Sequence, residues 1–574
     1  MRRPWAVVRS PAQLRRWVRR TLAESYVPPL DDQYGAWLGR RSLTAEQLRR
    51  MADECATLSY RPLISIVTPV YNTPEGSLRE AINSVRTQIY PHWQLCLADD
   101  ASPRAHVARV LAEFAALDDR IEVVSLPQNS GISGASNAAL ALAKGEFVGL
   151  LDHDDELQPQ ALLEVVKLLN AERGLDMIYS DEDKVTPDGR RFAPFFKPDW
   201  SPNLLLSCNY VAHFSVFRRS LLEEIGGFRS AFDGSQDYDL VLRASERTTR
   251  IAHIPGQLYS WRAIPGSAAA STGAKPYAYT AAAEALRETL ERRGWSGRVE
   301  LTATTGQYSL QLDPPAGAFV SVIIPTRSKD ALLRRCLRSI AAHPPVVRHE
   351  VIVVDSATGE PMPADLVGVI AAVVAYDRDI FNFSRAVNMG AARAGGDYLL
   401  LLNDDTEALS DGWLEALLSH AQRPEVGVVG ARLVDRRGEP QHEGIVLGIG
   451  GRPAANVSFP WWELGECLRD CSAVTAACMM TRRSVFEQLG GLDESLRLAW
   501  NDVDYCLRAR KAGYAVLYTP LAALRHDEGS TRGAEPHEDD DATFRERWGD
   551  PLALPDPYYN ANFDRSRGPF VLGE

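Results

Sequence analysis

A cluster of acids directly after an apolar run is the first feature of this sequence with chemical potential. In the segment GEFVGLLDHDDELQPQAL, residues 145–162, four acids fall within five positions. The cluster has three interpretations: a solvated turn that caps the following helix, the acid and base pair of a glycosidase, or oxygen ligands for Mg²⁺ or Mn²⁺. An Mg²⁺ or Mn²⁺ site would bring a diphosphate with it. Taken alone, this segment favours the capping turn as much as the other two interpretations together.

A second occurrence of the same pattern changes this balance. The segment GDYLLLLNDDTEALSDGWL, residues 396–414, again runs from an apolar stretch into acids. Three further pairs of segments match in the same order along the chain: 62–85 with 318–340, 93–102 with 349–358, and 226–244 with 490–509. Four matched blocks predict two copies of one domain, each of roughly 200 residues. A helix cap does not require acids in both copies, and a glycosidase has no reason to duplicate a nucleotide-sized crevice, so we favour the metal site.

The elements that must position these acids follow from the pattern of hydrophobic residues. In each copy, continuous apolar strands alternate with amphipathic helices, which predicts an α/β fold with a mainly parallel sheet covered on both faces. Ligands of such sheets bind at the carboxyl ends of the strands. Four acids stand just after apolar strands: Asp99, Asp152, Asp355 and Asp405. We therefore expect the acids to converge on one crevice in each copy.

Bulk composition limits the classes of function. A chain of 574 residues is too long for one core and predicts at least two domains. Its net charge of −12 argues against a nucleic-acid partner. No apolar run approaches the roughly 18 residues that span a bilayer, and the first residues lack the apolar segment of a signal peptide. Together with eight scattered cysteines and no CxxC pair, these features predict a cytoplasmic protein with reduced thiols.

The first residues form a separate basic segment. Seven arginines precede the first acid, Glu24, and Leu14, Trp17, Val18 and Leu22 share one helical face. A short basic amphipathic helix either lies on an anionic membrane surface or docks on the next domain. Docking is the simpler interpretation, and peripheral contact with the inner membrane is the alternative.

These patterns divide the chain into five parts. We expect a helical basic extension, a first domain, a helical linker, a second domain and a C-terminal tail, at residues 1–61, 62–265, 266–317, 318–533 and 534–574. A rival acidic cluster, YSDEDK at residues 179–184, has no counterpart in the second copy. We interpret this cluster as a loop near the acceptor.

Each half resembles an inverting family 2 glycosyltransferase domain with the GT-A fold. The resemblance covers residues 62–265 and 318–533, and the tandem arrangement is similar to bacterial proteins that build O-antigen or other surface polysaccharides. It rests on the matched blocks and on FKPDWSPNLLLSCNY, GSQDYDLVLR and LYSWR in the first half, and NDVDYCLRARKAGY and LRHDEGSTRG in the second. It implies two GT-A, Rossmann-like domains in tandem.

The resemblance assigns binding roles in the first half. Tyr71, Asp99 and Asp100 would hold the nucleobase, because an aromatic face stacks on a pyrimidine and a carboxylate accepts its imide N–H. Asp152 and Asp154 match the DxD motif, which holds a divalent metal, Mn²⁺ or Mg²⁺, on the diphosphate of the sugar nucleotide.

In the second half the matching positions diverge. Arg327 stands where the first half has Tyr71, and an arginine also stacks on a base. Asp355 keeps the nucleobase carboxylate. The resemblance implies a metal site of Asp404, Asp405 and His526, in which Asn403 replaces the first acid of the DxD motif.

The histidine of this metal shell is less certain in the first half. There, Ser260 occupies a place in LYSWR where related sequences often carry histidine. We interpret the nearby His253 as a strand residue.

One acid in each half matches the catalytic base of the family, namely Asp237 and Asp502. The alternative is an acid in the first turn of a helix that is stabilised by the helix dipole. Because the same aspartate recurs in both copies, we favour the base.

These assignments predict a bifunctional enzyme that transfers sugars from nucleotide-sugar donors to a growing, lipid-linked surface glycan. A metal would stabilise the leaving diphosphate, and the base would deprotonate the attacking hydroxyl in one inverting displacement. Two alternatives remain: one catalytic domain with one scaffold domain, and a nucleotide-sugar or glycan sensor without turnover.

Overall fold

The computed structural model describes most of the chain, from Leu30 to Glu574 with six internal gaps. The described residues are 30–263, 276–327, 331–356, 368–376, 380–459, 461–527 and 538–574. The arginine-rich helix expected before residue 24 lies outside them. The first described helices are α2 (Leu30–Arg41) and α3 (Ala45–Thr57). In the described part of the chain, no helix has the length and apolar character needed to cross a membrane.

The first domain is built on a nine-stranded sheet. Its strand order is β3-β2-β1-β4-β8-β6-β9-β5, with β7 beside β6. β8 runs antiparallel to β4 and β6, whereas β1, β2, β3 and β4 are parallel neighbours, as are β6 and β9. The strands are β1 (Ile64–Val70), β2 (Trp93–Asp99), β3 (Ile121–Ser125), β4 (Phe147–Leu150), β5 (Glu156–Leu157), β6 (Met177–Val185), β7 (Arg191–Phe195), β8 (Ser215–Arg218) and β9 (Ile251–Arg262).

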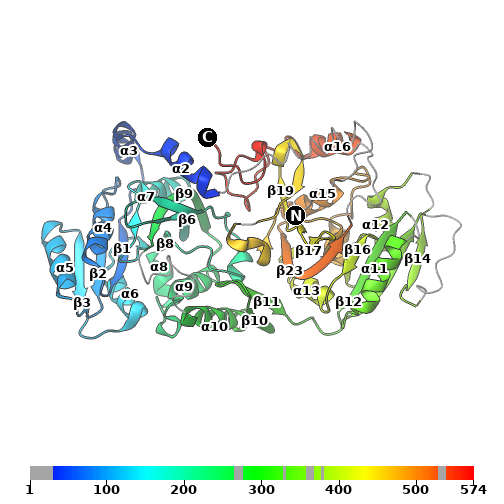
Figure 1. Cartoon of the computed structure of the whole chain (residues 1–574), viewed down its shortest axis with the longest axis horizontal. Helices are drawn as coiled ribbons and strands as arrows, with labels where there is room; N and C mark the ends of the chain where they lie inside the picture. Colours follow the sequence, from blue (N-terminus) through cyan, green and yellow to red (C-terminus); the bar gives the residue numbers. More distant parts are fainter. Residues whose placement is uncertain are drawn as a thin grey trace, which may run out of the picture.

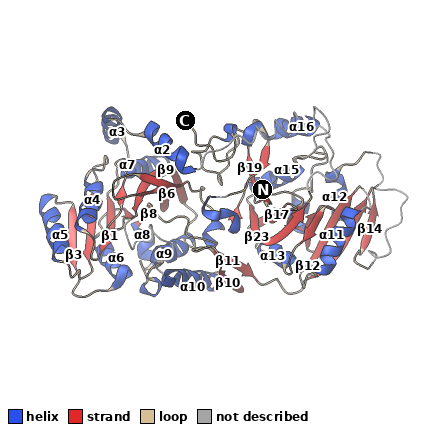
Figure 2. Cartoon of the chain, viewed as in Figure 1, coloured by secondary structure: helices blue, strands red, loops and turns tan. Residues whose placement is uncertain are grey.

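Helices flank this sheet on both sides (Figure 2). They are α4 (Glu75–Arg86), α5 (Ala105–Leu117), α6 (Gly131–Leu142), α7 (Ala161–Ala171), α8 (Arg219–Ile225) and α9 (Gln236–Ser245). Helix α4 shows why they pack there: Leu78, Ala81, Ile82 and Val85 form one apolar stripe, and all four are buried. Burying a leucine, isoleucine or valine stabilises the fold by about 1.5–3 kcal/mol each.

The second domain repeats this architecture. Its ten-stranded sheet has the order β14-β13-β12-β15-β22-β17-β23-β16, with β18 beside β17 and β21 beside β23. Position by position, this is the order of the first sheet, so the predicted duplication and the tandem α/β fold are confirmed. The path strands are β12 (Phe319–Thr326), β13 (Arg348–Asp355), β14 (Ala372–Ala375), β15 (Tyr398–Leu402), β16 (Thr406–Ala408), β17 (Val426–Val434), β22 (Cys478–Arg482) and β23 (Ala515–His526).

Shorter strands and five helices complete the second domain. The strands are β18 (Pro440–His442), β19 (Ile445–Leu447), β20 (Ala454–Asn456) and β21 (Arg469–Asp470). The helices are α11 (Ala331–Ala342), α12 (Phe383–Arg393), α13 (Trp413–Ala421), α14 (Arg483–Gln488) and α15 (Asn501–Lys511). All eight cysteines of the chain are free thiols, and seven of them are buried.

The segment between the domains is more than a helical linker. After α10 (Pro276–Arg292), the chain forms a hairpin of β10 (Gly297–Leu301) and β11 (Tyr308–Leu312). The alternation of apolar and polar residues in YSLQL is typical of a half-buried strand. Gly306, with φ +82°, supplies the left-handed position of the connecting turn. Figure 1 shows this hairpin between the two sheets.

The YSDEDK cluster is not a loop, contrary to the sequence-based expectation. It lies inside strand β6, and Asp181, Glu182 and Asp183 are all buried. Each carboxylate has partners: Lys197 N donates to Asp181, Lys197 Nζ to Glu182, and Tyr34 and other groups to Asp183. The polarity of the segment made it resemble a loop, but tertiary hydrogen bonds satisfy these acids within the sheet.

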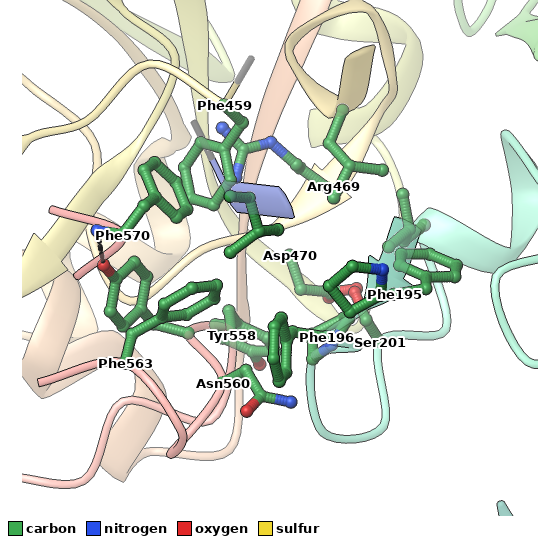
Figure 3. Close-up of a pocket in the computed structure, with 16 residues that line it drawn as sticks. Phe195, Phe196, Ser201, Phe459, Arg469, Asp470, Tyr558, Asn560, Phe563 and Phe570 are labelled. Carbon is green, nitrogen blue, oxygen red and sulfur yellow. Dashed lines mark hydrogen bonds between the residues drawn. The ribbon is translucent and has the colours of Figure 1, made fainter. Parts of the chain in front are cut away.

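The C-terminal tail and α2 close the seam between the domains. The tail follows α16 (Glu538–Trp548) and returns toward α2 and the first domain (Figure 1). Its Phe563 and Phe570 pack with Phe196 of the first domain and Phe459 of the second, as Figure 3 shows. Beside these rings, Asp470 of the second domain accepts hydrogen bonds from Ser201 Oγ at 2.7 Å and from Asn203 Nδ2 at 2.7 Å.

His253 is a buried residue of strand β9, as expected, and it provides a pH-dependent contact. Its Nε2 lies 2.9 Å from Asp181 Oδ1, and its Nδ1 lies 3.0 Å from Asp199 Oδ1. Burial lowers the pKa of His253, but the two aspartates outweigh this effect and raise the pKa above its ordinary value of 6.5. The protonated form therefore stabilises the fold fully below pH 6.5, and this contribution is lost as the pH rises through the folded-state pKa.

We expect His253→Gln to lower the free energy of unfolding more in mildly acidic buffer than in alkaline buffer. Urea denaturation of both proteins across the pH range measures the difference. A gap between the two proteins that stays constant with pH would contradict the prediction.

Candidate functional site

A large cavity lies at the carboxyl ends of the first sheet. Its volume is about 960 Å³, and its lining includes Asp152, Glu182, His213 and Asp237. Asp152 stands two residues after the end of β4, whereas Asp237 comes from the first turn of α9. The structure thus brings a predicted metal ligand and the predicted base to one cavity, although 85 positions separate them in sequence. Their roles in binding and catalysis stay predictions.

Asp152 is one of three groups whose ligand atoms come together. The oxygens of Asp152 and Asp155 and a ring nitrogen of His213 all lie within 4.8 Å of one another. Asp155 is already engaged, since Tyr259 Oη donates to its Oδ2 at 2.5 Å and Arg262 N to its Oδ1 at 2.7 Å. Burial and the neighbouring acids Asp152 and Asp154 raise its pKa well above the ordinary range. Asp154, the second acid of the predicted motif, is not in this group.

His213 is the site residue that the sequence did not indicate. Its Nε2 lies 3.9 Å from Asp152 Oδ2, its Nδ1 lies 3.3 Å from Glu182 Oε2, and its ring stacks on Tyr259. Burial lowers the pKa of His213, but the hydrogen bond and charge of Glu182 outweigh this and raise it to about 9. In the sequence, His213 stands in the run NYVAHF, which carries no recognisable motif. Its place in the site becomes clear from the structure, where it contacts the buried Glu182.

Asp237 sits where a base can meet an acceptor. Its side chain is partly exposed, and Asn209 Nδ2 donates to its Oδ2 at 2.8 Å. Burial raises the pKa of Asp237, and the charge of His213 opposes this effect. Two positions further along α9, Asp239 is fully buried and paired with Arg243 at 2.8 Å and with Arg229. The two acids therefore differ: Asp239 is an internal ion pair, and Asp237 faces the cavity.

The predicted nucleobase residues lie at the ends of β1 and β2. Tyr71 is 45% exposed, whereas Asp99 and Asp100 are buried. Asp99 Oδ1 accepts the main-chain N–H of Ser102 at 3.1 Å, and Asp100 Oδ1 accepts that of Ser130 at 2.6 Å. The carboxylates thus order the loops that flank the exposed tyrosine ring.

The second domain places its predicted residues differently. A cavity of only about 50 Å³ lies beside Arg327, Asn403 and Asp404. Thr326 Oγ1 donates to Asp404 Oδ2 at 2.7 Å, and the Arg327 guanidinium lies 5.6 Å from the ring centre of Phe381. Asp355 is buried at the end of β13.

Asp405 and His526, two of the predicted metal ligands, lie close together in the second domain. Asp405 Oδ1 lies 3.3 Å from His526 Nε2, and His526 Nδ1 lies 2.8 Å from Gln441 Oε1. Asp502 is partly exposed in the first turn of α15, and its Oδ2 accepts the main-chain N–H of Ala476 at 3.1 Å.

The strand register corrects the expected counterpart of His526. In the second sheet, Glu407 pairs with Arg525, and in the first sheet the matching Glu156 pairs with Ser260. His526, one residue later, therefore corresponds to Trp261 and not to Ser260. In the first domain the histidine beside the acids is His213, in the loop before β8, whereas in the second it is His526, at the end of β23.

Comparison with known proteins agrees with this duplicated site. The family model for "Glycosyl transferase family 2" matches residues 65–226 and 321–490, one segment in each domain. The chain belongs to glycosyl transferase family 2. The family predicted from the sequence motifs is confirmed.

Curated relatives of this family 2 glycosyltransferase are longer proteins. An "Uncharacterized protein y4gI" of Sinorhizobium fredii is 42% identical over 545 residues, which is 91% of this chain and 60% of the relative. The "O-antigen biosynthesis protein RfbC" of Myxococcus xanthus is 38% identical over 553 residues, 93% of this chain and 42% of the relative. The chain thus spans less than two thirds of either protein.

Solved structures resemble the glycosyltransferase only distantly. S. aureus TarS 1-349 in complex with UDP-GlcNAc superposes with a TM-score of 0.32 at 20% identity, covering 40% of this chain and 72% of that one. A superposition at this score carries no argument about substrates.

Proposed function

We propose that the chain is a two-site inverting glycosyltransferase that extends a bacterial surface polysaccharide. The observation that supports the proposal is the cavity of about 960 Å³ that both Asp152 and Asp237 line, which would bring a metal ligand and a base to one space. This volume is at the upper end of the roughly 300–1,000 Å³ of ligand pockets. The similarity to an O-antigen biosynthesis protein supports a glycan product.

The proposed reaction is a single displacement. A nucleotide sugar binds with its base against Tyr71 and its diphosphate toward Asp152. Asp237 takes the proton of an acceptor hydroxyl as the hydroxyl oxygen bonds to the anomeric carbon. The bond from that carbon to the diphosphate breaks at the same time, and the nucleoside diphosphate leaves with the electron pair. Attack from the opposite face inverts the anomeric centre.

The residues of both copies fit a divalent metal. Asp152 in the first domain and Asp405 in the second offer carboxylate oxygens, the donors that Mg²⁺ and Mn²⁺ prefer, and each lies within 4 Å of a histidine ring, His213 and His526. Asp405 Oδ1 is buried and has no hydrogen-bond donor among the described residues. When bound, the metal would neutralise the charge on the leaving diphosphate.

Removing divalent ions is expected to stop nucleoside diphosphate release, and Mn²⁺ is expected to restore it. Asp152→Asn should raise the Mn²⁺ concentration needed for half-maximal release about tenfold or more, because an amide oxygen is a weaker ligand than a carboxylate. Asp188→Asn, at an exposed acid in a turn of the same domain, is the control. Release that chelation does not change would refute metal dependence.

We propose that the acceptor is a lipid-linked glycan, used at the cytoplasmic face of the membrane, with the arginine-rich segment before residue 24 as the contact. Sedimentation of the full chain with vesicles that contain anionic lipid, against neutral vesicles, tests this contact.

A second candidate is a chain in which only the first domain turns over. The contrast between about 960 Å³ beside Asp237 and about 50 Å³ beside Asp404 favours it, as does Asn403 in place of an acid. Domain-specific substitutions separate the two candidates, as argued below.

A further inference from the structure

A second large cavity lies next to the one that contains Asp237. Its volume is about 920 Å³. One wall comes from the β10–β11 hairpin, and the other comes from the second domain, including η4 (Trp461–Glu466) and the middle of β23. We call it the interdomain cavity. It is nearly as large as the cavity that contains Asp237, which we call the transfer cavity, yet none of the predicted donor or base residues lines it.

The turn of the hairpin lies between the two cavities. Ala303, Thr304, Tyr308 and Glu463 line both of them. Thr304 Oγ1 donates to Glu463 Oε2 at 2.5 Å, and Gln307 Nε2 donates to the main-chain oxygen of Glu463 at 3.2 Å. A residue of the second domain thus reaches the transfer cavity of the first. A long ligand in that cavity would pass this turn to enter the interdomain cavity.

The lining of the interdomain cavity determines which ligand fits. Six serine and threonine residues contribute to it, so hydroxyl donors and acceptors are plentiful. Among its described residues, four glutamates stand against one arginine: Glu439, Glu443, Glu463 and Glu466 against Arg432. Glu443 and Glu466 already hold Arg432 between them. This excess of negative charge repels a nucleoside diphosphate, whereas sugar hydroxyls donate readily to carboxylates.

We propose that the interdomain cavity binds the part of the glycan acceptor that precedes the reacting sugar. The growing chain would then run from Asp237 across the hairpin turn to the second domain. The inference rests on the proposed transfer in the first domain, and it adds an oligosaccharide subsite made by both domains. It also explains why the two domains are joined in one chain, because one glycan would contact both copies.

The test uses the full chain and a ladder of fragments, from single sugars to short oligosaccharides, cut from the surface polysaccharide of the host cells. Glu463→Gln keeps the size of the side chain and removes its charge, and Ala303→Trp narrows the passage beside the turn. Both positions are exposed, so we expect both variants to fold. Glu300→Gln, on the same hairpin but outside both cavities, is the matched control.

We expect the KM of Glu463→Gln to rise about three- to tenfold for the long fragments, which corresponds to the difference between a hydrogen bond to a carboxylate and one to a neutral amide. The increase should grow with fragment length. Ala303→Trp should remove the advantage of long fragments over single sugars, and Glu300→Gln should behave as wild type. A KM change that is the same at every length would overturn the proposal.

Calorimetric binding of the same fragments distinguishes failure of the subsite from failure of the proposed function. If wild type transfers sugar but binds long and short fragments equally, the subsite is wrong and the transfer stands. If wild type transfers nothing but binds long fragments more tightly than Glu463→Gln does, the subsite stands and the transfer is wrong. Neither transfer nor binding would refute both.

Discussion

Replacing Asp237 with asparagine is expected to lower kcat of the first domain by about 10²- to 10⁴-fold, the usual contribution of a general base. An amide has the size of the carboxylate but does not take up the acceptor proton. Its oxygen still accepts the hydrogen bond from Asn209 Nδ2, now 2.8 Å from Asp237 Oδ2, so the local fold should remain. Nucleoside diphosphate release from a panel of nucleotide sugars with Mn²⁺ measures the effect, and binding of the free nucleotide should not change.

Asp502→Asn is the matched variant, because the two aspartates open corresponding helices. If each variant abolishes turnover of a different donor, both domains are transferases. If only Asp237→Asn has an effect, the second domain is a scaffold, as the small cavity beside Asp404 suggests. A kcat of Asp237→Asn equal to that of wild type would show that another group takes the proton.

Hydrophobic periodicity predicted the central strands of the sheets, and the matched sequence blocks predicted the duplication. The parallel strands β1, β2 and β4, like β12, β13 and β15, are mostly apolar runs, and Asp152 and Asp405 follow β4 and β15, so this parallel topology brings them to the carboxyl edge. Asp237 was predicted from its recurrence as Asp502. The acids after β4 and β15 lie at the same edge of their sheets because both sheets have the same strand order. Asp237 and Asp502 hold matching positions because they lie in the first turns of the corresponding helices α9 and α15.

Residues whose position depends on tertiary contacts escaped prediction. His213 lies beside Asp152 because it contacts Glu182, which forms a buried ion pair with Lys197. Hydrophobic periodicity does not predict such a buried ion pair. The same buried acids made YSDEDK look like a loop. The counterpart of His526 was displaced by one residue, because cross-strand register is set by pairing and not by sequence spacing.

The C-terminal tail contacts strand β6 of the first domain, next to the site of Asp152 and His213, and the sequence did not predict this contact. Asn560 Nδ2 donates to Asp181 at 3.0 Å and to the main-chain oxygen of Lys197 at 2.8 Å, and Asn562 Nδ2 donates to Asp181 at 3.3 Å. Strand β6 alternates its faces, so Asp181 meets the tail while its neighbour Glu182 meets the site.

Lys197 connects the two faces of this strand. Its main-chain N–H donates to Asp181 at 2.8 Å, and its Nζ donates to Glu182 at 3.2 Å and to the main-chain oxygen of His213. Burial lowers the pKa of Lys197, and the charge of Glu182 opposes this effect. The tail, nearly 350 residues away in sequence from His213, thus holds the lysine that positions this histidine beside Asp152.

Removing both amides, as Asn560→Ala with Asn562→Ala, is expected to lower the free energy of unfolding by about 3–6 kcal/mol, since hydrogen bonds to a buried charge contribute about 1.5–3 kcal/mol each. Turnover by the first domain should fall while turnover that depends on Asp502 persists. Urea denaturation and donor-specific release measure the two effects, with Ser566→Ala, on an exposed turn of the same tail, as the control.

A charge exchange tests whether the tail acts through Asp181 and not through general packing. Asn560→Asp alone places a second carboxylate against Asp181, and we expect it to destabilise the first domain strongly. In the double variant with Asp181→Asn, the carboxylate stands at position 560 and the amide at position 181, so the pair again has one charge and one amide. Because coupled residues deviate from additivity, the double variant should recover part of the lost stability and first-domain kcat. If the two substitutions simply add, the tail merely covers the seam, and His213 takes its position without it.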